Sequence, residues 1–221
     1  MSLIASLLVL LAAHIAAPAA ASLPPSRAGI VLDLDVRLPP AIQRLAVEEA
    51  ARVWAPYRVD VTLRKVPSPV ESSGPEGAVL SVHLAGLAPR LMPSSSPFGS
   101  MRFVNGLPEP VVFLHYDAIS RAIANSVALG LREGQWPPAL RDRMLGRIVG
   151  RVLAHEIGHF VLRSPRHASR GLMRPIQYIW ELLAGDGELF GLTSEDLSLL
   201  RAAMTLRGAV VENDLRPSGW P

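Results

Sequence analysis

The chain of 221 residues contains no cysteine and one lysine, Lys65, and aromatic residues make up only 5% of it. Without cysteine there are no disulfides, thiolate metal sites or cysteine nucleophile, so every protein ligand of a metal must be His, Asp or Glu. Nearly all of the positive charge behind the net +3 comes from arginine, and the arginines are scattered. Nucleic-acid binding needs a clustered basic face or a recognisable motif, and the sequence has neither.

Hydrophobic residues make up 49% of the chain and charged residues 19%. This is the composition of a globular protein, and it is too apolar for a disordered one. Domains most often have about 100–150 residues, and the sequence shows neither an internal repeat nor a second domain boundary. We therefore expect one domain, over residues 22–221.

The N-terminus carries an apolar run over residues 3–21 that ends in three alanines before Ser22. Pro18 and the A-x-A pattern at the end of the run are typical of an export signal that is cut after Ala21. A membrane anchor is the alternative, because the run approaches the ~20 residues that span a bilayer. In both cases the sequence predicts an exported protein, secreted or periplasmic, which is membrane-bound only if this segment is retained.

The first part of the remaining chain has the pattern of a strand, a helix and a second strand. Apolar and polar residues alternate from Ile30 to Val36 and again from Arg58 to Leu63. Between them, apolar residues recur at helical spacing from Pro39-Pro40 to Pro56. Strand, helix and strand in this order predict a βαβ unit, and hence an α+β fold with a mixed, twisted sheet.

The rest of the chain alternates between further strands and helices. Strands are expected at residues 79–84, 101–104 and 111–115, and Met101–Val104 is expected to be an edge strand that ends in a turn at Asn105-Gly106. Helices are expected at residues 116–129, from Pro137-Pro138 to about Ser164, at 176–183 and at 193–206.

The segment His155-Glu156-Ile157-Gly158-His159 lies in the long predicted helix. One helical turn separates the two histidines, so both imidazoles can reach one metal ion with Glu156 beside them. Zinc in such a site activates a water molecule, and Glu156 is then the general base that takes its proton. The pattern predicts a zinc-dependent hydrolase. The alternative is that the two histidines are chance neighbours on an amphipathic helix.

A helical wheel places these histidines between an apolar arc and an arc that contains Arg143, Arg147 and Arg151. This position predicts a metal at the rim of a cleft, with protein on one side and substrate access on the other.

A hydrolytic zinc site usually has three protein ligands and one position for water. His167, which follows the predicted end of the helix, is the best candidate for the third ligand, and Glu181 is the alternative. His83 and His115 lie in predicted strands and are interpreted as ordinary strand residues, not ligands. Tyr178 is interpreted as a packing residue.

The run from His155 to Pro175, HEIGHFVLRSPRHASRGLMRP, resembles the active-site region of metzincin zinc peptidases. Gly171–Pro175 is similar to the methionine turn of the matrixin branch, and Phe190–Leu197 resembles the start of the final matrixin helix. The resemblance implies a metzincin-like fold and a secreted zinc endopeptidase, with Met173 as an apolar floor beneath the metal. It also implies that a peptide or protein substrate lies along the edge strand by strand addition.

Two departures mark the chain as a divergent, bacterial-type member. Metzincins usually have a glycine after the second histidine, where the chain turns, and their third histidine comes sooner than His167. Leu162 and Arg163 occupy that region here, so we expect the turn to be made through Ser164-Pro165. Two other functions stay open at this point: a non-catalytic binding module that kept the fold, and a zinc hydrolase of non-peptide amides.

Overall fold

A computed structural model describes residues 27–64, 77–85, 98–124, 126–128, 130–175, 178–185 and 187–214. The export signal or anchor predicted at residues 1–21 lies outside these residues. Within the described part of the chain, no helix combines the length and the apolar character needed to cross a bilayer.

A five-stranded mixed sheet forms one layer of the fold, with the strands in the order β2-β1-β3-β5-β4. Strands β1, β2, β3 and β5 run parallel to one another, whereas β4 pairs antiparallel with β5 and lies at one edge. The bounds are β1 Ala28–Leu34, β2 Val59–Leu63, β3 Ala78–Leu84, β4 Gly99–Val104 and β5 Leu107–Leu114. The predictions of a mixed sheet, a βαβ start and an edge strand are confirmed.

The predicted end of the first strand is wrong by two residues. β1 ends at Leu34, and the chain then turns, with the Asp35 carboxylate accepting hydrogen bonds from the backbone and side chain of Arg37. Val36, which was expected to face the core, is therefore 91% exposed.

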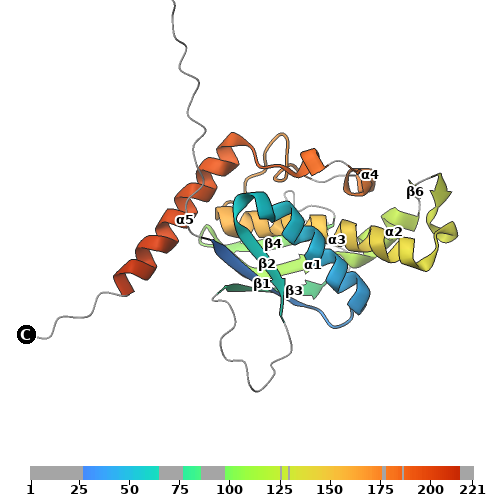
Figure 1. Ribbon diagram of the computed structural model, residues 1–221, viewed down its shortest axis with the longest axis horizontal. Coiled ribbons are helices and arrows are strands. Elements are labelled where there is room, and N and C mark those ends of the chain that lie inside the picture. Colours follow the sequence, from blue (N-terminus) through green and yellow to red (C-terminus); the bar gives the residue numbers. More distant parts are fainter. Residues whose placement is uncertain are drawn as a thin grey trace, which may run out of the picture.

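The helices are α1 Pro40–Trp54, α2 Tyr116–Ala124, α3 Pro138–Leu162, α4 Ile179–Leu183 and α5 Ser194–Asp214. A short hairpin of β6 (Val127–Ala128) and β7 (Leu131–Arg132) ends α2 earlier than predicted. Short 3-10 turns lie at Ala55–Tyr57, Glu133–Gln135 and Gly187–Phe190. In Figure 1, α5 extends away from the sheet, and it is longer than the sequence indicated.

Helices α1 and α3 pack tightly against each other and against one face of the sheet (Figure 1). Small residues stand at every fourth position of α3, at Gly146, Gly150, Ala154 and Gly158. A Cβ atom on Gly146 would lie 2.4 Å from Leu45 Cβ, and one on Gly150 would lie 2.5 Å from the Ala46 carbonyl oxygen. This stripe of small residues is therefore what lets the two helices approach so closely.

The alternate residues of the strands that face these helices form the core. They include Ile30 and Leu32 of β1, Leu80 and Val82 of β3, and Val112 and Leu114 of β5. Trp54, at the end of α1, is fully buried and donates a hydrogen bond from its indole Nε1 to the Ala154 carbonyl oxygen of α3, 3.0 Å away. The core thus fixes α3, which carries the candidate site, relative to both α1 and the sheet.

Candidate metal centre

The second half of α3 is buried on every side, from Ile148 to His159. The sequence predicted that the histidines lie at the border of a buried face, at the rim of a cleft. This position is wrong for the side chains of His155 and Glu156, because each of them is only 1% exposed. The helical wheel treated α3 as a surface helix, whereas α1, the sheet and the chain after residue 170 cover it together.

Arg151 shows the same error, because it was placed on the polar arc but is 1% exposed. Its Nε donates to Glu49 of α1 at 2.7 Å, and its Nη1 donates to the carbonyl oxygens of Leu182 and Ala184 at 2.9 and 2.5 Å. The guanidinium also lies 4.4 Å from the ring centroid of Phe190. Arg151 is therefore a buried cation that ties α1, α3 and the segment around α4 together through bonds from its Nε and Nη1 atoms.

Backbone carbonyls hold the rings of both histidines on α3. The Nδ1 atom of His155 lies 2.7 Å from the Leu172 carbonyl oxygen, and that of His159 lies 2.7 Å from the Ser164 carbonyl oxygen. A carbonyl only accepts, so each Nδ1 must carry the proton, which leaves each Nε2 with a free lone pair. This is the tautomer and the orienting bond that histidine ligands of metals have.

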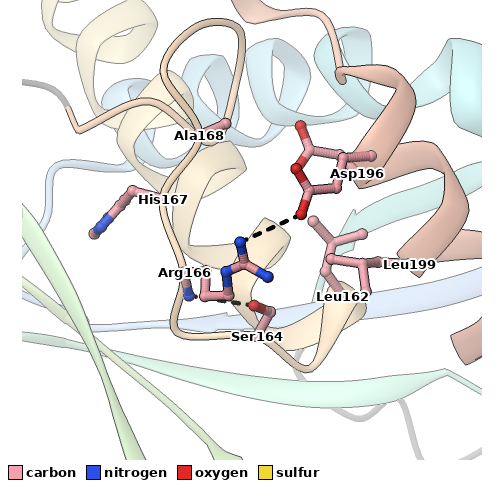
Figure 2. A pocket seen from close by; sticks show the side chains of 8 residues that line it. Leu162, Ser164, Arg166, His167, Ala168, Asp196 and Leu199 are labelled. Carbon is pink, nitrogen blue, oxygen red and sulfur yellow. Dashed lines mark hydrogen bonds and ion pairs between the residues drawn. The ribbon is translucent and has the colours of Figure 1, made fainter.

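His167 joins these two histidines from the loop after α3. His167 is among the residues that line a small pocket at the start of α5, and Figure 2 shows its side chain pointing away from that of Arg166. The Ala168 amide bonds to the Met173 carbonyl oxygen at 2.9 Å, which folds this loop back beneath the helix. The His167 ring centroid lies 5.2 Å from that of His155 and 4.9 Å from that of His159.

The three histidines together form a cluster that can hold a metal ion. One nitrogen from each ring lies within 4.8 Å of the other two, and ligand nitrogens around a tetrahedral zinc ion are about 3.4 Å apart. The Nε2 atoms of His155 and His167 are buried without a hydrogen-bond partner. Buried nitrogens without a partner are costly, and a cation between them would satisfy both. The residues present therefore fit zinc, the ion that the sequence predicted.

Burial sets the protonation of the cluster. It lowers the pKa of His155 to about 3, with the neighbouring His159 adding to the effect, and that of His159 to about 4. Burial lowers the pKa of His167 as well. The rings are consequently neutral at pH 7, which is the form that binds a metal.

Glu156 lies beside the cluster, against the edge strand. A Cβ atom on Gly99, the first residue of β4, would lie 2.9 Å from the Glu156 Oε1 atom. Only glycine leaves this space for the carboxylate. The sequence predicted that this strand begins at Met101, so Gly99 lay outside it and the contact was missed, although a glycine in a strand often marks a close approach.

The chain turns after His159 without the glycine that metzincins usually have in this region. Arg163 adopts the left-handed conformation, with φ 52°, and its amide bonds to the His159 carbonyl oxygen. The turn was predicted at Ser164-Pro165 and thus comes one residue earlier. A left-handed arginine costs about 1–2 kcal/mol relative to glycine, and nothing in the sequence pattern indicates that this residue adopts it. The turn brings the Ser164 carbonyl onto His159.

Met173 lies where the methionine turn was expected, beneath α3. Its Sδ atom would be 2.3 Å from a Cβ atom on Gly158, and the side chain is buried. Gly171 opens the turn with φ +76°, and the Arg174 amide closes it on the Gly171 carbonyl oxygen at 3.2 Å. The same turn presents the Leu172 carbonyl to His155.

Gly171→Ala is expected to destabilise this turn strongly. Its Cβ atom would lie 2.3 Å from the Gly191 carbonyl oxygen, which also accepts the Leu172 amide. Left-handed strain and overpacking together predict a loss of about 2–4 kcal/mol in the free energy of unfolding, measured by urea titration. Gly130→Ala is the matched control, since Gly130 has φ +75° and no atom within 4 Å of a Cβ. Equal losses in the two variants would contradict the close contact.

A second prediction concerns the metal-free protein and pH. Burial raises the pKa of Glu156 to about 8, above its unfolded value of about 4.3. The folded state therefore keeps a proton that the unfolded state has lost, and the free energy of unfolding falls as pH rises through this range, by about 1.4 kcal/mol per pH unit. Glu156→Gln should remove this loss. Urea unfolding with a chelator present should show the variant more stable than wild type at pH 8 but not near pH 4.5.

Glu181, the alternative third ligand, does not join the histidines. It is buried, and its carboxylate accepts from Arg174 at 2.5 Å and from the Tyr178 amide at 3.3 Å. Tyr178 itself was interpreted as a packing residue, but its side chain is exposed and stacks on Trp180. Glu181 therefore fixes the chain that follows the methionine turn.

The strand histidines lie apart from the cluster. His83 is exposed beside the Phe113 ring, and His115 is buried with its Nε2 atom 3.3 Å from the Ser100 hydroxyl. Neither belongs to the group of described residues that can hold a metal.

Comparisons with known proteins add one likeness. No protein-family model matches the chain, and no curated protein matches it. Among solved structures, archaemetzincin from Methanopyrus kandleri is similar, with 15% sequence identity and a TM-score of 0.41, over 81% of this chain and 96% of that chain. This likeness assigns neither a family nor an activity to the chain.

Proposed function

We propose that this chain is an exported zinc-dependent peptidase in which His155, His159 and His167 bind zinc and Glu156 is the general base. The observation that carries the proposal is the histidine cluster itself: one nitrogen from each ring lies within 4.8 Å of the other two, carbonyls orient two of the rings, and the Nε2 atoms of His155 and His167 are buried without a partner. Three protein ligands leave one tetrahedral position for water or substrate, as hydrolytic zinc sites require.

When bound, zinc supplies a Lewis acid that polarises a carbonyl and lowers the pKa of a water molecule toward 7. The protein supplies the base. Glu156 follows His155 directly in the sequence, and its carboxylate lies against the edge strand. Its high pKa in the metal-free protein means that it holds a proton readily, and a nearby cation would shift this pKa back toward neutral pH. Glu156 is thus suited to take a proton and to pass it to a leaving amine.

The position of β4 favours a peptide as substrate. β4 lies at the edge of the sheet, and among the described strands only β5 pairs with it. Its Phe103 ring lies 6.2 Å from the His159 ring, and its Gly99 lies beside Glu156. A peptide that adds to the free edge of β4 would therefore pass the histidine cluster, held mainly by backbone hydrogen bonds.

Two observations argue against the other functions. The proposed site has an open strand edge beside the metal. Hydrolysis of small non-peptide amides would not need such an edge, whereas binding of an extended peptide uses it. A binding module that only needed zinc would gain nothing from Glu156, because no basic side chain of the described residues pairs with this buried carboxylate. A buried acid that costs stability is typical of a catalytic group.

Zinc analysis and peptide cleavage test the proposal together. We expect the purified protein to contain close to one zinc ion per chain and to cleave members of a broad peptide mixture, with activity lost to a chelator and restored by zinc. Bound zinc without any cleavage would instead support the binding module, and cleavage of non-peptide amides alone would support the third function. Export is tested separately, by whether the mature protein outside the cytoplasm begins at Ser22.

A further inference from the structure

A groove lies beside the candidate metal centre, between the start of β5 and the end of α3. Leu107, Pro108, Phe160 and Arg163 line it, and we call it the hairpin groove. Phe160 follows the ligand His159 directly in the sequence. Pro108 pairs across the β4–β5 hairpin with Phe103, whose ring contacts the His159 ring. The hairpin groove is therefore next to the point at which a peptide along β4 would reach the metal.

The walls of the hairpin groove combine apolar surface with one free positive charge. Leu107 is 56% exposed, so its side chain offers apolar surface to a ligand. Arg163 is exposed, and none of the described carboxylates lies within ion-pair distance of it. Its charged neighbours are paired, Arg102 with Glu109 and Arg166 with Glu195. The guanidinium of Arg163 is thus available to a ligand, and it prefers a carboxylate.

We propose that the hairpin groove binds an acidic side chain of the peptide substrate, above all glutamate, whose apolar stem packs on the walls while its carboxylate meets Arg163. This inference rests on the proposed peptidase function and names the substrate class of that site. Glutamate suits the groove better than aspartate because its longer stem covers more of the apolar wall.

The direction of β4 decides which side of the scissile bond this residue occupies. β4 runs from Gly99, beside Glu156, to Val104, next to the groove. A peptide that pairs antiparallel with β4, the more stable arrangement, runs the opposite way. Its residues near the hairpin groove therefore come before the residues near Glu156. The acidic side chain is consequently expected on the amino side of the cleaved bond.

The backbone of Arg163 allows a clean test of its side chain. Its φ of 52° suits glycine and asparagine better than arginine. Arg163→Gly and Arg163→Asn thus remove the guanidinium and keep the turn that places the Ser164 carbonyl on His159. Arg163→Asp also tolerates this conformation and reverses the charge. Arg170→Asn is the matched control, because Arg170 is exposed and lies outside the groove lining.

The experiment measures binding and cleavage with the same peptides, a fluorescent set in which a single glutamate, glutamine or lysine moves along an otherwise constant chain. Binding is measured by fluorescence polarisation to the zinc-loaded Glu156→Gln protein, and cleavage with the wild type. We expect glutamate to be preferred to glutamine by about three- to tenfold at one or two positions on the amino side of the cleaved bond. Arg163→Asn and Arg163→Gly should abolish the preference, Arg163→Asp should transfer it to lysine, and Arg170→Asn should keep it.

Each outcome decides between the two ideas. Three results would overturn the role of the hairpin groove, even if peptides are cleaved. The glutamate preference could survive in Arg163→Asn, it could be lost equally in Arg170→Asn, or it could fall on the carboxyl side of the cleaved bond. If no peptide is cleaved, the peptidase proposal fails, and the binding arm still decides the inference: an Arg163-dependent glutamate preference supports it, and equal affinity for glutamate and glutamine refutes it.

Discussion

Glu156→Gln is expected to lower peptide hydrolysis by about a hundred- to ten-thousandfold, the range that a general base contributes. Glutamine has nearly the same shape as glutamate and fits the space beside Gly99, but it accepts no proton at neutral pH. The three histidines and their carbonyl partners are untouched, so zinc should stay bound. The measurement is kcat/KM on one cleaved peptide, with zinc content determined on the same sample.

Two controls make this result specific to proton transfer. Glu156→Asp keeps the carboxylate but draws it back from the edge strand, so it should recover part of the lost activity. Glu48→Gln removes a carboxylate from the exposed surface of α1, where Glu48 pairs with Arg44, and should leave kcat/KM unchanged. A Glu156→Gln protein that is as active as wild type would rule out the assigned base, whatever its zinc content.

His167→Ala is expected to reduce zinc affinity by more than about a hundredfold. Loss of a group that only orients a ligand already costs about 10–100-fold, and His167 is proposed to bind the ion directly. The change leaves His155 and His159 on α3, and two imidazoles hold zinc far more weakly than three. Competition with a chromogenic chelator at pH 7 measures the affinity, and the metal-free variant should unfold at a urea concentration close to that of the wild type.

Glu181→Ala separates the two candidates for the third ligand. Glu181 is bonded to Arg174 and to the Tyr178 amide, so its loss should lower the free energy of unfolding by about 1–3 kcal/mol. Zinc affinity should change less than threefold, because the carboxylate takes no part in the cluster. The reverse pattern, with weak zinc binding in Glu181→Ala and normal binding in His167→Ala, would assign the third ligand to the glutamate.

Periodicity and spacing predicted the features that depend on local pattern. Alternation from Ile30 and helical spacing after Pro40 predicted the βαβ start, and Met101–Val104 was correctly placed at an edge. The spacing of His155 and His159, with His167 after a proline, predicted three histidines that the structure brings together. In each case the signal lies within a few residues or repeats at a regular interval.

The features that the sequence did not predict depend on contacts between distant segments or on single backbone torsions. Arg151 looks like a surface residue on a helical wheel until Glu49, which is 102 residues away, packs beside it. The carbonyls of Leu172 and Ser164 orient the histidines, but a carbonyl carries no side-chain signature. The left-handed torsion of Arg163 is disfavoured for its residue type, so no propensity indicates it.

The stripe of small residues on α3 also has a consequence for how this part of the protein opens. Gly158 belongs both to this stripe and to the metal-binding segment, and a Cβ atom on it would lie 2.3 Å from the Met173 Sδ atom and 3.6 Å from the Trp54 ring of α1. Because Trp54 is also bonded to the Ala154 carbonyl oxygen, we expect α1 and the second half of α3 to open as one cooperative unit. Slow amide exchange should then occur at the same rate in both helices.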